Sequence, residues 1–247
     1  MNILLIGAQA SGKGTQAELL THMLGIPHVS SGDLFREEIA EQTERGRYLQ
    51  IYLNRGDLVP DHFTVTMILR RLQRPDCQSG VLLDGFPRTL VQAKAFDDGL
   101  HTCDKKIHAV VYLHVPREKL LQRISGRFIC QEHQHVYNIS FSPPMVPGIC
   151  DVDGSELFQR SDDKGAVVAH RLDLFFSQTL PLLGYYEKQG KVLEVDGNQS
   201  IDKVHQDIVD ALSRCACFDM TPSDSPHHEP KGGCVRTENA EDDRMCI

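Results

Sequence analysis

Apolar positions along the chain form short uninterrupted runs, separated by longer stretches in which they recur every three or four residues. The runs at 2–6, 81–84 and 108–115 are apolar nearly throughout. Strands covered on both faces in a parallel sheet have this character. Shorter runs at 27–29 and 191–195 are also expected to be strands, which makes five in all.

The stretches between these runs have the period of amphipathic helices. They lie at 13–24, 32–41, 61–72, 89–96, 116–124, 165–188 and 201–212. Strands and helices that alternate in this way predict an α/β fold: a doubly wound, five-stranded parallel sheet with helices on both faces.

Residues 127–163 interrupt the alternation. This segment is too long for an ordinary connection and contains three prolines. Insertions of this length are often functional lids. Short strands at 128–130 and 135–138 are expected to fold it. The chain from 215 onward has few apolar residues and is expected to be disordered.

Composition narrows the class of protein. The chain has 247 residues, 40% of them hydrophobic, and a net charge of −8, which argues against general nucleic-acid binding. No apolar run approaches the roughly 20 residues that cross a bilayer, so no membrane association is expected. The chain has eight cysteines and no secretory signal, which favours free thiols or metal ligands over disulfide bonds. A cytoplasmic location is therefore expected.

A glycine-rich loop follows the first expected strand. Gly7 and Gly12 stand before Lys13, in the spacing of a P-loop, and a helical pattern follows. Glycines let successive backbone N–H groups point at one phosphate chain, and the lysine reaches the terminal phosphates. Gly14 stands where a Ser or Thr usually binds magnesium. The loop therefore predicts a nucleoside triphosphate site.

A second set of polar residues follows the strand at 81–84. This strand ends in Asp84, a carboxylate placed to hold hydrated magnesium beside the phosphates. Arg88 lies just beyond it, at the carboxyl edge where open α/β sheets bind ligands. A helix cap and a solvated charge are the simpler interpretations of these two residues.

Several motifs occur together in a fixed order. They are Gly-Lys-Gly-Thr-Gln at 12–16, Ser31-Gly32-Asp33 with Arg36, Asp84-Gly85-Phe86-Pro87-Arg88-Thr89 with Gln92, and Arg160 with Asp162-Asp163. Over about residues 1–213 the chain resembles the long-lid form of the adenylate kinases. The resemblance implies a core of 1–29, 60–125 and 164–214, an AMP-binding segment of 30–59 and a lid of 126–163.

The resemblance also implies an activity, the reversible, magnesium-assisted transfer of the terminal phosphate of ATP to AMP, giving two ADP. The implied catalytic residues are Lys13, Asp84, Arg88, Arg127, Arg160 and Arg171. The implied ATP-binding residues are Ala10, Ser11, Gly12, Lys13, Gly14, Thr15, Arg123, Arg127, Val136, Tyr137 and Gln199. The implied AMP-binding residues are Ser31, Arg36, Asp57, Leu58, Val59, Gly85, Phe86, Pro87, Arg88, Gln92, Arg160 and Arg171. Gln9 and Ala10 depart from the family, which usually has Pro and Gly there.

The expected lid carries two pairs of metal-ligand residues. Cys130 and His133 form one pair, Cys150 and Asp153 the other, and 16 residues separate them. This spacing resembles paired-knuckle zinc sites, so structural Zn²⁺ is expected. His135 is a spare imidazole that could confuse the ligand assignment. The alternative is a hydrogen-bonded network without metal.

Two other functions stay open. A kinase of a different nucleoside monophosphate would have a similar sequence, and a P-loop switch would bind nucleotide without transferring phosphate. The Asn-Lys-x-Asp motif of a guanine-binding switch is missing from the sequence. One chain carries both expected nucleotide sites, so a monomer is expected to suffice.

Overall fold

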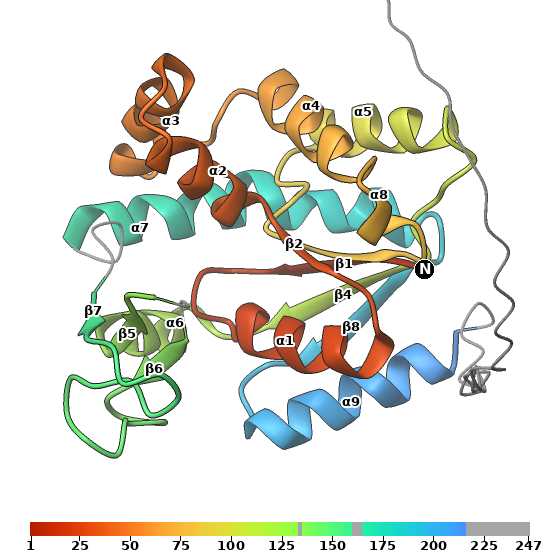
Figure 1. Cartoon of the computed structure of the whole chain (residues 1–247). Helices are drawn as coiled ribbons and strands as arrows, with labels where there is room; N and C mark the ends of the chain where they lie inside the picture. Colours follow the sequence, from red (N-terminus) through yellow and green to blue (C-terminus); the bar gives the residue numbers. More distant parts are fainter. Residues whose placement is uncertain (133–134, 160–164, 216–247) are drawn as a thin grey trace, which may run out of the picture.

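The computed structural model describes residues 1–132, 135–159 and 165–215, and its centre is a parallel sheet (Figure 1). The strands are β1 (Asn2–Gly7), β2 (His28–Ser30), β3 (Val81–Asp84), β4 (Ala109–His114) and β8 (Val192–Asp196). Their spatial order is β2-β3-β1-β4-β8. The five-stranded parallel sheet predicted from the sequence is confirmed. The predicted tail lies almost wholly in 216–247, outside the described residues.

Helices cover both faces of this sheet. They are α1 (Lys13–Leu24), α4 (Asp61–Arg71), α5 (Leu90–His101), α6 (Arg117–Ser125), α7 (Gly165–Leu174), α8 (Leu183–Glu187) and α9 (Ile201–Ser213). Figure 1 shows α1 and α9 on one face and α4, α5 and α8 on the other. The doubly wound arrangement follows from this division.

Successive side chains of β1 point to opposite faces of the sheet, and each face is covered by its own layer of helices. Ile3 and Leu5 pack with residues of α1 and α9, whereas Leu4 and Ile6 pack with residues of α4, α5 and α7. All four side chains are at most 3% exposed. A central strand buried on both faces must be apolar at every position, which is the pattern that predicted it.

The single helix predicted over 165–188 is wrong in detail. The structure has α7, then a π-helical turn (Phe175–Thr179), a 3-10 turn (Leu180–Leu182) and α8. Pro181 lies in the 3-10 turn and has no N–H to donate to the preceding turn. The helical path therefore continues, but its hydrogen-bonding pattern changes at this point.

Residues 30–59 form a helical pair, α2 (Ser31–Ala40) and α3 (Glu44–Arg55). The helix α3 was not predicted from the sequence. The Thr43 hydroxyl caps it by accepting from the backbone N–H of Gly46 at 3.0 Å. The pair has a small core of its own, built on Phe35, Leu49 and Val59.

The lid segment folds as a separate small sheet. Its antiparallel strands are β5 (Arg127–Cys130), β6 (Val136–Asn138) and β7 (Leu157–Phe158), in the order β6-β5-β7. The first two were predicted, and β7 was not. Its apolar core consists of Cys130, Tyr137 and Cys150, with Leu157 against them.

Within the three described ranges, none of the helices combines the length and the apolar character needed to cross a membrane.

Candidate active site and lid metal centre

The phosphate loop lies between β1 and α1 and turns back on itself. The N–H of Ser11 donates to the carbonyl of Ala8 at 3.1 Å, and Lys13 Nζ donates to the same carbonyl at 2.9 Å. Gly12 has a φ of 97°, a left-handed conformation that glycine adopts without strain. The loop therefore has the curled backbone that a phosphate-binding site requires.

Ala10 is also left-handed, with a φ of 62°. Its Cβ makes this conformation less favourable than it would be for glycine. Arg123 lies against the same turn, donating to the carbonyls of Ala10 at 3.5 Å and Gly197 at 3.0 Å. Arg123 thus joins the phosphate loop to the loop before α9.

Five charged groups affect one another around Lys13. Burial is the largest cause that lowers the pKa of Lys13, to about 8; the carboxylate of Asp84 opposes this shift, and the positive charges of Arg88, Arg127 and Arg171 add to it. Charges act on one another in this way only when they lie near one another. Five of the six predicted catalytic residues therefore share one site, and the sixth, Arg160, lies outside the described residues.

Asp84 ends β3 and is ionised in this site. Burial acts to raise its pKa, but a hydrogen bond with His28 and the charges of Lys13 and Arg88 leave it below the ordinary value. His28 Nε2 lies 3.6 Å from Asp84 Oδ2. A largely buried but ionised carboxylate is a suitable oxygen ligand for magnesium.

A small cavity of about 50 Å³, open to solvent on one side, lies beside these charges. Nine of the residues predicted to bind AMP line it: Ser31, Arg36, Asp57, Leu58, Val59, Gly85, Arg88, Gln92 and Arg171. The sequence analysis missed five more: Gly32, Phe35, Leu53, Gly56 and Thr64. Because Arg88 and Arg171 also act on Lys13, the cavity and the phosphate loop adjoin.

Phe86 and Pro87 are placed differently from the other predicted AMP residues. Neither lines the cavity. The Phe86 side chain is fully buried and meets Phe96 edge to face, with ring centroids 4.9 Å apart. These two residues shape the turn that carries Arg88.

Gln92 is held by hydrogen bonds at both ends of its amide. Its Oε1 accepts from the backbone N–H of Arg88 at 2.7 Å, and its Nε2 donates to Asp61 Oδ1 at 2.9 Å. These partners determine which end of the amide is which. One N–H and one lone pair remain for a ligand.

The floor of the cavity is fixed by Gly85. Its carbonyl accepts from Ser31 Oγ at 2.7 Å and from Arg88 Nε at 2.7 Å. Arg36 forms an ion pair with Asp33 at the cavity rim.

The end of α3 rests on α7. Gly56 has a φ of 74°, and a Cβ there would lie 2.9 Å from Arg171 Cγ and from Val167 Cγ1. The next residue, Asp57, meets His170 of α7 with Oδ1 and Nε2 2.8 Å apart. This contact joins the helical pair to the helix that carries Arg171.

The remaining predicted ATP residues border the loop before α9 and the lid. Gln199 Nε2 donates to the carbonyl of Asp196 at 2.9 Å and to Asp207 Oδ2 at 2.9 Å. Val136 is exposed, whereas the ring of Tyr137 lies in the lid core.

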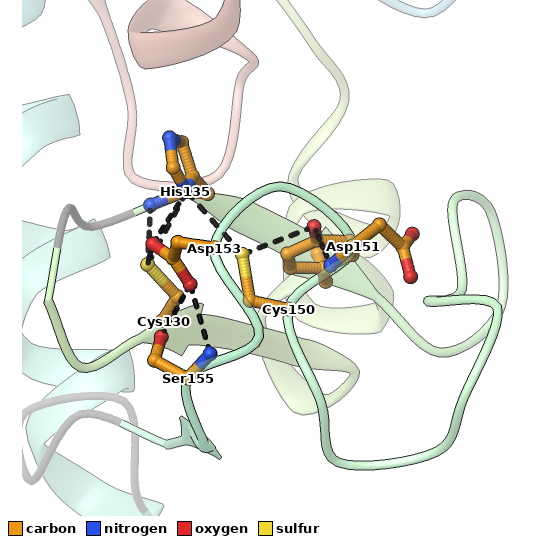
Figure 2. Close-up of polar contacts among 7 residues, drawn as sticks. Cys130, His135, Cys150, Asp151, Asp153 and Ser155 are labelled. Atoms are coloured by element: carbon orange, nitrogen blue, oxygen red, sulfur yellow. Dashed lines mark hydrogen bonds and ion pairs between the residues drawn. The ribbon is translucent and has the colours of Figure 1, made fainter.

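The lid brings together four metal-ligand residues, which Figure 2 shows pointing toward one another: Cys130, His135, Cys150 and Asp153. Their ligand atoms all lie within 4.8 Å of one another. His133, the predicted imidazole ligand, lies outside the described residues. Two thiols, an imidazole and a carboxylate are the donor types that zinc prefers, and four of them would complete a tetrahedron. The residues present therefore fit a zinc-type divalent cation.

Three neighbours of the candidate site residues were not predicted from the sequence. His28 beside Asp84, Asp61 behind Gln92 and His170 opposite Asp57 come from other elements. No motif marks them, because their roles depend on tertiary contacts. His135, by contrast, was recognised as a spare imidazole.

The parallel sheet, the phosphate loop, the adjoining acceptor cavity and the two inserted segments define a P-loop nucleoside monophosphate kinase fold. The family model "Adenylate kinase" matches residues 5–191. Adenylate kinases of Moorella thermoacetica and Staphylococcus aureus are 45% and 43% identical to this chain, over 214 and 212 residues. These alignments cover 87% and 86% of this chain and 99% of each relative. The chain belongs to the adenylate kinase family.

Proposed function

We propose that this chain catalyses its family's reaction, the reversible transfer of the terminal phosphate of ATP to AMP, giving two ADP. The observation that carries the proposal is the cavity beside the phosphate loop, whose Arg88 and Arg171 also act on Lys13. A nucleotide hydrolase would not need a second site that binds a phosphate group.

The donor and acceptor residues keep the roles assigned from the sequence. Ala10 to Thr15, with Arg127, hold the ATP phosphates, while Arg123, Val136, Tyr137 and Gln199 border the adenosine. The AMP side uses the nine cavity residues, with the turn at Phe86 and Pro87 positioning Arg88. Arg160 is proposed to reach the transferring phosphate from the end of the lid.

The reaction needs charge neutralisation more than proton transfer. The attacking oxygen of AMP is already deprotonated near pH 7, so no general base is required. Lys13, Arg88 and Arg171 offset the crowded phosphate charges and align the two nucleotides. Asp84 would hold magnesium, which when bound supplies further charge neutralisation at the phosphates.

The two inserted segments, 30–59 and 126–163, are proposed to close over AMP and ATP respectively. Closure of such segments completes the site and excludes water, which otherwise competes with AMP as acceptor. We further propose that the lid holds a structural zinc-type cation through Cys130, Cys150, Asp153 and one histidine.

The protein is proposed to act in the cytoplasm. It is also proposed to act as a monomer, because one chain supplies both nucleotide sites. Light scattering of the purified protein during size-exclusion chromatography tests the second point. A mass near 27.7 kDa is expected, and twice that mass would contradict it.

A coupled assay of ADP formation tests the main proposal. ATP is offered with AMP, GMP, CMP or UMP, and AMP is expected to be the preferred acceptor. Lys13→Met and Arg88→Ala should each lose transfer by at least about 100-fold, as expected when a group that stabilises transferring charge is removed. Arg74→Ala, an exposed arginine outside the cavity, is the matched control and should keep normal activity. A folded Lys13→Met variant with near-normal transfer would overturn the assignment, and a preference for another monophosphate would move the protein to a different kinase specificity.

A further inference from the structure

The hairpin between β5 and β6 places His135 directly beside Cys130. The backbone N–H of Cys130 donates to the carbonyl of His135 at 2.9 Å, and the N–H of His135 points at Cys130 Sγ at 3.4 Å. The two residues are therefore cross-strand neighbours, and their side chains share one face of the lid sheet.

The distances around His135 match the edges of a metal-centred tetrahedron. Its Nδ1 lies 3.4 Å from Cys130 Sγ, 3.3 Å from Cys150 Sγ and 3.3 Å from Asp153 Oδ2. Zinc bonds of about 2.0–2.3 Å imply edges of about 3.3–3.8 Å between ligand atoms. Cys130 Sγ and Asp153 Oδ2, 3.3 Å apart, give a fourth edge of this length.

Asp153 is held so that only one oxygen faces the cluster. Its Oδ1 accepts from the backbone N–H of Ser155 at 2.9 Å and from Ser155 Oγ at 2.7 Å. Its Oδ2 is the atom beside Cys130 and His135. Figure 2 shows Ser155 on the outer side of this carboxylate. The geometry suits a ligand that binds through a single oxygen.

The fourth ligand, Cys150, also has an orienting neighbour. The hydroxyl of Tyr137 lies 3.4 Å from Cys150 Sγ and accepts from the backbone N–H of Asp151 at 2.8 Å. Because that N–H occupies a lone pair, the phenol proton is available for the sulfur. Such outer contacts fix ligand orientation in metal sites.

We infer that His135, and not His133, is the imidazole ligand of the lid, so that Cys130, His135, Cys150 and Asp153 bind one zinc-type divalent cation. This inference rests on the lid metal site proposed above and names its fourth ligand. On binding, the two thiols release their protons to solvent, and His135 binds through Nδ1 with its proton on Nε2. The cation's two positive charges then offset two thiolates and one carboxylate, which leaves the site at −1.

Metal analysis of the full-length protein and of paired variants tests the assignment. Wild type and His133→Ala are expected to keep about one equivalent of zinc after dialysis, as a closed four-ligand site would. His135→Ala should fall below about a tenth of an equivalent, with at least a 100-fold loss of affinity in chelator competition. Substitution of cobalt for zinc gives absorption bands that report on the ligands.

The variant His135→Cys separates ligation from folding. It should regain about one equivalent of metal, with a stronger thiolate-to-cobalt absorption band. If His133→Ala loses the metal and His135→Ala keeps it, the assignment is overturned while the metal site stands. A wild-type protein below a tenth of an equivalent would refute both. The phosphotransfer assay is a separate measurement, so the proposed activity is judged independently.

Discussion

At the scale of single residues, the site depends on side chains kept in costly states. Lys13 is partly buried among three arginines, and its pKa is lowered to about 8. At pH values between about 8 and the ordinary lysine pKa of 10.5, Lys13 has lost its proton in the folded chain but keeps it in the unfolded chain. The burial penalty of Lys13 is therefore present below pH 8 and disappears as the pH rises through that window.

The same shift predicts proton uptake when ATP binds. Phosphate charges favour the ammonium form, so at pH 8.5 binding should take up a measurable fraction of a proton from solution. Calorimetry in buffers of different ionisation enthalpy measures this fraction. Binding heats that do not depend on the buffer would contradict it. At pH 6.5 the uptake through Lys13 should vanish, which provides the internal control.

Asp61 sets the orientation of Gln92. The substitution Asp61→Ala removes the partner of the amide nitrogen and should raise KM for AMP by about tenfold, the effect of losing a hydrogen bond to a charged group. KM for ATP should change much less, because Asp61 and Gln92 are not among the residues assigned to ATP. Steady-state kinetics with each substrate varied in turn test this split. An equal rise in both constants would point to a general loss of structure.

At the scale of elements, the contact between α3 and α7 positions the AMP side of the site. Gly56 has no side chain and therefore permits a close approach to Val167 and Arg171. Next to it, the contact between Asp57 and His170 joins the end of α3 to α7. This bond links two elements that are 113 residues apart in sequence. The place of Arg171 relative to the cavity therefore depends on it.

Breaking that bond should weaken AMP binding selectively. His170→Ala is expected to raise KM for AMP by about two- to fivefold, since exposed ion pairs contribute roughly 0.2–1 kcal/mol. His170→Lys gives Asp57 a positively charged donor and should restore most of the loss. In a double-mutant cycle, Asp57→Asn should cost less in the His170→Ala background than in the wild type, because its contact with His170 is already lost. Additive effects would show that the two residues act separately.

Elements were predictable from sequence where burial is uniform. The five strands were found because their short runs are rich in apolar residues. The phosphate loop was found because a strand followed by the spacing from Gly7 to Lys13 has few other interpretations. The helix α3 was missed, since its exposed surface shows Tyr48 and Ile51 among charged residues. The strand β7 has only two residues, too few for any period. Asp61 and His170 could not be identified because their partners are distant in sequence.

At the scale of the whole molecule, apolar packing is divided among separate clusters. Two large clusters cover the faces of the sheet, a third lies in the α2–α3 pair, and the fourth is the lid core. The lid core contains only Cys130, Tyr137 and Cys150 with Leu157 against them. Such a small core requires another source of stability, which a bound cation would supply.

Removal of metal should therefore affect the lid before the rest. With a chelator present, calorimetry is expected to show a small early transition from the lid, while the main transition moves by less than about 3 °C. Cys150→Ser should produce the same profile without a chelator. A single transition shifted as a whole would mean that lid and core unfold together.

The residues after 215 should not be needed for catalysis. The relatives align over 99% of their length with 86–87% of this chain. A variant ending at residue 215 is expected to keep kcat/KM within about twofold and to unfold at the same temperature, because α9 is complete by Ser213. A large loss of either would show that the omitted residues contact the core.

The separateness of the lid core has a consequence for how the protein can evolve. Its four packed residues share no member with the clusters around the sheet. Substitutions within this small cluster can therefore adjust the heat resistance of the segment one residue at a time, while the packing around the sheet stays as it is. The lid is in this sense an exchangeable module, and adaptation to a new temperature or metal supply can proceed there without redesign of the active site.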